Sequence, residues 1–305
     1  MEEPMFQFPG EDERVAAVSQ AFSSKLFYVD AFCTAWYDAL SEKWFSGLSP
    51  KVRDLIVRLV MQALRQFRSI NEECRRAEGF CGDIVARSLF ETTVAVGFML
   101  KPGIKLELIP LLDKQTKLPK KTDKGVVKHR AAQCANPAVS FPPEFRVKLY
   151  HAHNAFSTLA ILEELAVVKG VAVHSGPESP ALLLARADAA EQEKEIGDEW
   201  SFVIKEAGWY SGLTLENTTA LVCPHLLDIY GVIYKSQSGK GHAAGALNLH
   251  DWFSDDFEIH MALRVGAMLV LFCINMLQTY LGLGEGVALA LDPWREQFHA
   301  VFDSE

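Results

Sequence analysis

The sequence predicts an all-α fold, a multi-helix bundle into which a long basic loop is inserted. In most segments apolar residues recur at steps of three and four, the period of a helix with one buried face. No series of alternating segments typical of strands interrupts them, and the one β-like stretch, Gly170 to His174, stands alone. Hydrophobic residues make up 49% of the chain and charged residues 23%, enough apolar surface to offset the entropy of ordering. At 305 residues the chain is close to the size at which one core stops growing, so we expect a single helical domain over 1–305.

The N-terminal part, 11–100, is expected to form three helices. Apolar residues repeat from Glu11 to Leu40, and a second pattern begins after Ser49-Pro50, a pair that suits a helix start, and ends near Gly79. The third pattern, from about Asp83 to Leu100, is apolar around most of its circumference. We therefore expect this third helix to lie in the centre of the bundle.

The C-terminal part, 142–305, continues the helical pattern after the loop. Its predicted helical segments are Pro142 to Gly170, shorter pieces within Ala181 to Gly208, Leu215 to about Tyr234, and a final long helix from about Asp255 to Leu283. The most apolar stretch, Val265 to Ile274, is shorter than the ~20 residues that span a bilayer. We interpret it as a core helix and expect no membrane partner.

Charge is distributed unevenly along the chain. The net charge of −9 argues against a surface that binds nucleic acid over its whole extent. The predicted loop, 101–141, differs, because Lys101 to Arg130 holds nine basic residues against three acidic ones. This segment is either a solvated loop or a surface that contacts phosphate. Under the second interpretation the RNA-binding residues would be Lys117, Lys120, Lys121, Lys124, Lys128 and Arg130.

Cysteine usage and the N-terminus indicate a cellular compartment. No pair among the six cysteines has the C-x-x-C spacing, and several lie in apolar helical runs, which is typical of free thiols in a reducing environment. The segment Met1 to Gly10 is acidic and lacks the pattern of an export signal. We expect a cytoplasmic protein without a disulfide-linked partner. The six cysteines are Cys33, Cys74, Cys81, Cys134, Cys223 and Cys273.

The first candidate for a functional site is Arg87 with Glu91, in the middle of the apolar third helix. The two lie four residues apart, on one face, and burial of either without a partner would cost stability. Two interpretations stay open. The pair either fixes the register of the helix as a buried ion pair or belongs to a catalytic site.

The second candidate is a glycine-rich turn that follows an apolar helix and includes Ser238 and His242. Its spacing does not match the phosphate-binding loop consensus. His242 is either a proton carrier near neutral pH or a structural histidine of the turn.

Together these positions resemble an uncharacterised bacterial family of all-helical proteins. The pattern is Arg-x-x-x-Glu at Arg87 and Glu91, then Tyr234 and Ser-x-x-x-His at Ser238 and His242; the resemblance covers about 50–100 and 195–283. The family has no settled activity to carry over. Its pattern is distantly similar to the HEPN superfamily of helical bundles, many of which are RNA-cleaving toxins and defence proteins.

The HEPN signature is an arginine followed, after four to six residues, by a histidine. Arg146 and His151 fit it, and His153 is also within range, although Val147 stands where that superfamily usually has a polar residue. In this resemblance the cation and the imidazole would address a ribose hydroxyl and its phosphate. Packing of the two histidines on a helix face is the alternative interpretation.

Two functions therefore follow as expectations. The first is a metal-independent ribonuclease or toxin-like defence effector, with a catalytic site of Arg87, Glu91, Ser238 and His242, or of Arg146 and His151. The second is a non-catalytic, homodimeric binding or scaffolding protein in which Arg87 and Glu91 form a buried pair. RNA or a nucleotide is the expected ligand of the first, and neither needs a cofactor or a metal, since no cluster of metal ligands stands out.

Overall fold

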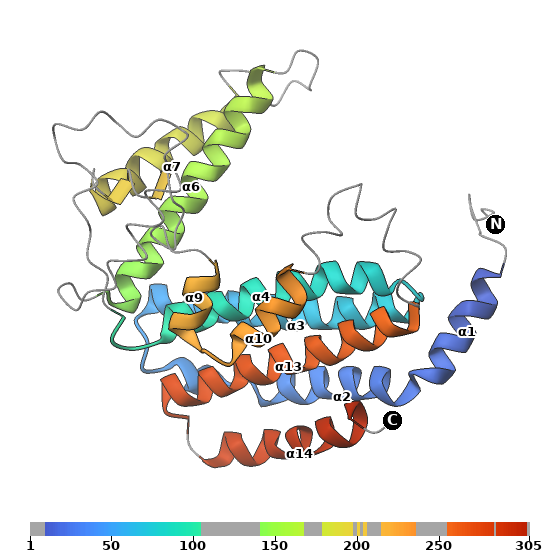
Figure 1. The fold of residues 1–305 in the computed structure, drawn as a ribbon. Coiled ribbons are helices and arrows are strands. Elements are labelled where there is room, and N and C mark those ends of the chain that lie inside the picture. The colour runs from blue at the N-terminus through green and yellow to red at the C-terminus, as the bar shows by residue number, and fades with distance from the viewer. Residues whose placement is uncertain are drawn as a thin grey trace. The chain divides into compact units, whose positions relative to one another are not determined.

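The structure, a computed structural model, is helical in the part that it describes (Figure 1). The described residues are 10–104, 141–167, 179–197, 200–201, 204–205, 215–235, 255–283 and 285–303. No strand occurs within these ranges, and the predicted all-α fold is confirmed for them. Most of the predicted basic loop, from residue 105 to residue 140, lies outside the described residues.

The contacts divide the chain into two compact units. Unit 1 combines residues 1–100 with 222–305, and unit 2 comprises residues 101–221. The sequence predicted a single helical domain over 1–305. That the two units unfold together as one domain stays a prediction.

Unit 1 is a bundle of helices in which two pairings dominate. They are the packing of α4 against α13, the long helix near the C-terminus, and against α3; α2 packs on α3 and α14 (Figure 1). Its elements are α1 (Glu11–Ala21), α2 (Ser23–Ala39), the 3₁₀ turn η1 (Glu42–Phe45), α3 (Pro50–Arg75), α4 (Gly79–Leu100), α10 (Leu226–Tyr230), the π turn η3 (Gly231–Lys235), α13 (Asp255–Leu281) and α14 (Glu285–Phe302).

The second half of α4 forms the centre of unit 1, as expected. Every residue from Thr92 to Leu100 is buried. The first half is different, since Ile84 is 51% exposed. Small residues bring α4 close to its neighbours: a Cβ at Gly79 would lie 2.8 Å from Cβ of Glu258 and 2.9 Å from the backbone nitrogen of Ile259, both in α13.

The helix α13 is the most apolar element of the unit. By length and composition alone Asp256–Leu281 would suffice to cross a membrane, and more than half of an apolar 18-residue part of it is buried in the structure. Residues Val265 to Ile274, predicted as core, are mostly buried against the other helices.

The structure corrects three predicted boundaries. The segment Glu11 to Leu40 is two helices, because the buried Phe22 has φ −106° and ψ 14° and interrupts the helix between α1 and α2. The segment Leu215 to Tyr234 is also broken: α9 (Leu215–Val222) ends one residue before Cys223, whose helical conformation Pro224 disfavours. The predicted final helix is not final, because Gly282 takes a left-handed φ of 62°, ends α13, and α14 follows.

Unit 2 contains a helical hairpin. Its helices α6 (Pro143–Val167) and α7 (Pro180–Ile196) pack on each other and run antiparallel, because Lys148 pairs with Glu195 at one end and Glu163 with Arg186 farther along. The start of α7 matches its sequence: the Ser179 hydroxyl accepts a hydrogen bond from the Leu182 amide, with Pro180 at the first helical position. Near the start of α6 the rings of Phe141, Phe145 and Trp200 pack together, with centroids 5.0–5.6 Å apart.

Candidate functional site

Arg87 and Glu91 form a surface ion pair on the first half of α4. The Nε of Arg87 lies 3.6 Å from Oε1 of Glu91, and the side chains are 35% and 48% exposed. The prediction of a buried pair is therefore wrong. The pair is exposed because this half of α4 has one face that no neighbouring element covers, and Ile84 is exposed as well. A pair of this kind typically contributes about 0–1 kcal/mol to stability.

Arg146 is fully buried near the start of α6. Its Nη2 donates a hydrogen bond of 2.9 Å to the backbone oxygen of Lys101. Burial lowers the pKa of the guanidinium to about 10, an effect that the Glu144 carboxylate opposes, so the side chain stays charged at neutral pH. A cation in this position anchors α6 to the chain at Lys101 and is not exposed to a phosphate in solvent.

His151 does not share the face of Arg146. Five residues along a helix turn a side chain by about 140°, so the two point in different directions from α6. His153, seven residues after Arg146, returns to the same side, but its side chain lines the groove described below. The described geometry thus gives no support to a site that combines Arg146 with His151.

The other predicted site residues lie outside the described residues. They are Ser238, His242, Lys117, Lys120, Lys121, Lys124, Lys128 and Arg130. Their convergence with Arg87 and Glu91, and their binding of RNA, stay predictions.

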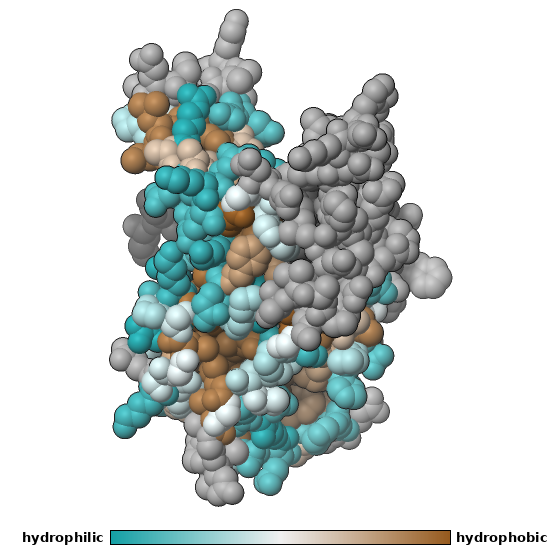
Figure 2. All heavy atoms as spheres, turned by 90° about the vertical axis from the view of Figure 1, so that its left-hand side faces the viewer, coloured by the Kyte–Doolittle hydropathy of each residue, from teal (hydrophilic) through white to brown (hydrophobic). Residues whose placement is uncertain are grey.

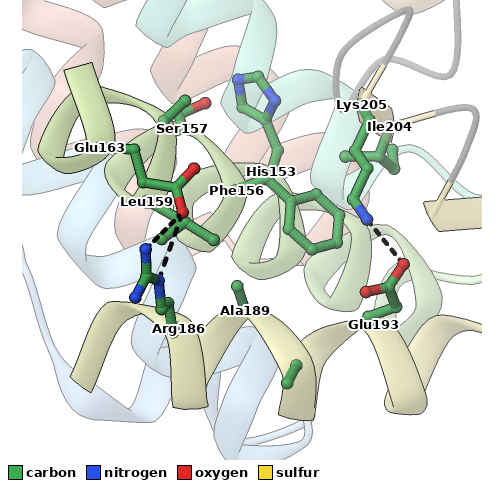
Figure 3. A pocket seen from close by; sticks show the side chains of 12 residues that line it. His153, Phe156, Ser157, Leu159, Glu163, Arg186, Ala189, Glu193, Ile204 and Lys205 are labelled. Atoms are coloured by element: carbon green, nitrogen blue, oxygen red, sulfur yellow. Dashed lines mark hydrogen bonds and ion pairs between the residues drawn. The ribbon is translucent and has the colours of Figure 1, made fainter. Parts of the chain in front are cut away.

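The hairpin of unit 2 forms a groove that the sequence did not single out. This α6–α7 groove has a volume of about 490 Å³ and opens to solvent (Figure 3). Its lining residues come from α6, from α7 and from the short stretch at 204–205. They are His153, Phe156, Ser157, Leu159, Ala160, Glu163, Arg186, Ala189, Ala190, Glu193, Ile204 and Lys205.

Two ion pairs belong to the groove, and Figure 3 shows them on opposite sides of its small floor residues. At one, Nε and Nη2 of Arg186 both donate to Oε1 of Glu163 at 3.3 Å. At the other, Nζ of Lys205 lies 2.6 Å from Oε1 of Glu193. The hydrogen bonds from Lys205 and from the Ser201 hydroxyl lower the pKa of Glu193. Each cation that lines the groove therefore has a carboxylate partner within it.

Between the ion pairs the groove is apolar. The ring of Phe156 lies under Nζ of Lys205, 4.6 Å from ring centroid to nitrogen, a cation–π contact. Ala160, Ala189 and Ala190 leave space above the helix backbones. Burial lowers the pKa of His153, so the imidazole is neutral at pH 7. The groove thus offers an apolar surface, a neutral imidazole and paired charges.

Sequence reasoning named His153 of these residues as a candidate, and only through the HEPN spacing. A signal was present, because His153, Phe156, Ala160 and Glu163 follow one another at steps of three, four and three, which places them in one stripe of α6.

Comparisons with family models, with curated proteins and with solved structures found no match for this chain. The resemblance to the HEPN superfamily and to the bacterial family therefore stays a prediction.

Proposed function

We propose that this protein is a non-catalytic binding protein that holds its ligand in the α6–α7 groove. The observation that carries the proposal is an open groove of about 490 Å³ whose floor is apolar and whose cations are neutralised by carboxylates of the groove itself. Concave, largely apolar sites with a few polar groups are the usual form of binding sites.

The same charges disfavour RNA cleavage at this place. Stabilisation of a phosphate that gains charge needs cations directed at it, and RNA binding depends on positive charge that is available to the backbone. Arg186 and Lys205 are engaged by Glu163 and Glu193, and Arg146 is buried. The ribonuclease proposal now depends on Arg87, Glu91, Ser238 and His242 alone.

The test uses a fluorescent apolar probe, anilinonaphthalene sulfonate, and a variant that fills the groove. Ala190 is exposed and lines the groove, so Ala190→Trp should occupy the space without disturbing the core. The control is Ala187→Trp, at an exposed alanine of the same helix that does not line the groove. We expect probe fluorescence with the wild type and with Ala187→Trp, and its loss with Ala190→Trp.

A second arm incubates the folded protein with single-stranded RNA in the presence of a chelator. Intact RNA, together with groove-dependent probe binding, supports the proposal. Cleavage that Arg87→Ala abolishes and Ala190→Trp leaves unchanged would contradict it in favour of the ribonuclease. Probe fluorescence that is equal in both tryptophan variants would show that the groove is not the binding site.

A further inference from the structure

The outer side of α3 concentrates positive charge in a chain whose net charge is −9. Between Asp54 and Glu72 this helix has no acidic residue but three arginines, Arg58, Arg65 and Arg68, and all three are exposed. Figure 2 shows hydrophobic residues exposed among hydrophilic ones on one face of the molecule, so hydropathy alone does not mark a binding surface. The run of arginines without carboxylates is a more specific signal, because it favours an anionic ligand.

Two of these arginines are aligned along the helix. Arg58 and Arg65 are seven residues apart, which is about two helical turns and about 10 Å, so they lie on one side of α3, with the exposed Gln62 between them. Neither has a hydrogen bond or an ion pair with another described residue. Arg68 donates a hydrogen bond of 3.1 Å to Glu72, but both side chains are exposed, and a pair of this kind contributes little to stability. A phosphate can therefore replace Glu72 at small cost.

An exposed aromatic ring lies beside the arginines, on α2. The side chain of Asp30 accepts a hydrogen bond of 2.7 Å from Asn71 of α3, and farther along α2 the ring of Phe32 lies 6.2 Å from that of Phe67, so the two helices run antiparallel. Tyr37 follows Asp30 by seven residues and therefore lies on the same side of α2, the side that meets α3. It lies opposite the turn of α3 that precedes Phe67, and it is 62% exposed.

The carboxylates nearest to this surface are engaged or turned away from it. Asp30 is held by Asn71 and by an arginine at the end of α3, and Oδ1 of Asp54 lies 3.7 Å from Nε of Arg53. Asp38 is exposed, but it lies eight residues after Asp30, about 80° farther around α2 and away from α3. The helix α3 as a whole has six basic residues against three acidic ones.

We propose that this α2–α3 surface, formed by Arg58, Arg65, Arg68 and Tyr37, binds single-stranded nucleic acid. The guanidinium fork of arginine matches phosphate oxygens, and exposed aromatic rings stack on unpaired bases. An acidic peptide would contact the arginines but would leave Tyr37 without a role, and a duplex would not offer it a free base. This activity goes beyond the ligand binding proposed for the α6–α7 groove and does not depend on it.

The test is fluorescence anisotropy at several salt concentrations with labelled oligothymidylate and oligouridylate of about 15 nucleotides. We expect both to bind, because neither contact involves the 2′-hydroxyl, and a duplex of the same length to bind more weakly. In the double variant Arg58→Gln and Arg65→Gln the affinity should fall by about tenfold or more. The slope of log K against log salt should become shallower by about 1.4, since each phosphate contact with a single strand contributes about 0.7.

The control for charge is Arg264→Gln, which removes an exposed cation from α13, the helix that packs on the buried side of α3. It should change neither the affinity nor the slope. Tyr37→Ala should weaken binding by about fivefold or more at an unchanged salt slope, and Tyr37→Phe, which keeps the ring, should bind as the wild type does. Circular dichroism verifies that each variant is folded.

Each contrary outcome is distinct. Absence of binding to the folded wild type at low salt would overturn the inference, and so would equal affinity for the duplex. Wild-type affinity in Tyr37→Ala, together with displacement of the oligonucleotide by polyglutamate, would show that the surface takes an acidic polypeptide instead. Ala190→Trp, which fills the α6–α7 groove, should bind the oligonucleotides as the wild type does; loss of binding in this variant would place the site in the groove and refute the α2–α3 surface.

Discussion

Replacement of Gly97 by alanine tests the packing at the centre of unit 1. The added Cβ would lie 2.5 Å from Sδ of Met276 in α13 and closer still to Cγ1 of Val222. Alanine gains about 1 kcal/mol over glycine in a helix interior. Overpacking costs about 1–3 kcal/mol, and we take the upper end because two neighbours overlap the new atom at once. The net expectation is a loss of about 2 kcal/mol in the free energy of unfolding, or about 4–8 °C in Tm for a unit of this size.

The assay is urea unfolding followed by circular dichroism, with Gly231→Ala as the matched control. Gly231 has a helical φ of −59° and open space where a Cβ would be, so this alanine should be neutral or stabilising. The double variant Gly97→Ala with Val222→Ala should be more stable than the two single effects predict, since the second change removes the overlapping methyl group. A Gly97→Ala protein as stable as the wild type would refute the close approach of α4 to α13.

Three further changes separate surface, anchor and groove. Glu91→Ala should alter the free energy of unfolding by less than about 1 kcal/mol in a thermal or urea melt, because its ion pair with Arg87 is exposed to solvent; a loss of several kcal/mol would restore the buried pair. Arg146→Ala should cost about 2–5 kcal/mol by the same measurement, because it leaves a cavity and an unsatisfied Lys101 carbonyl, and an unchanged midpoint would contradict the anchoring role. Burial lowers the pKa of His153 below its ordinary 6.5, so the unfolded chain takes up this proton first and the stability due to the neutral imidazole is lost as pH falls below 6.5. The stability of His153→Gln should accordingly fall less with acidification than that of the wild type, and parallel pH profiles would show that the imidazole is solvated.

Periodicity located the helices because each one buries a stripe at helical spacing, as α3 does from Val52 to Cys74. Breaks were harder to predict. The spacing of apolar residues continues through Phe22 although the backbone there is not helical. Pro224 was a signal for the end of α9. Pro293 lies inside α14, where proline disfavours a helix, and α14 was not predicted.

Most of the candidate site could not be predicted from the spacing of residues along the sequence. A helix that is apolar around its circumference is buried only where neighbouring helices cover it, and the neighbours of α4 leave Arg87 and Ile84 partly exposed. The groove exists because two segments meet antiparallel, which brings Glu163 to Arg186 and places Glu193 beside Lys205. The spacing of residues along one segment predicts the stripe of α6, but it does not predict that α7 faces this stripe.

The two halves of α6 should also differ in local stability. The half from Pro143 to Ala155 contains the anchored Arg146 and buried residues such as Val147 and Leu149, whereas residues 156–165 contain none that is buried. Regions with few buried contacts open at a lower free energy than the core. Amide hydrogen exchange should therefore be faster in residues 156–165 than in 143–155. Equal protection in both halves would mean that the distal half opens no more readily than the half anchored by Arg146, and it would contradict this difference in local stability.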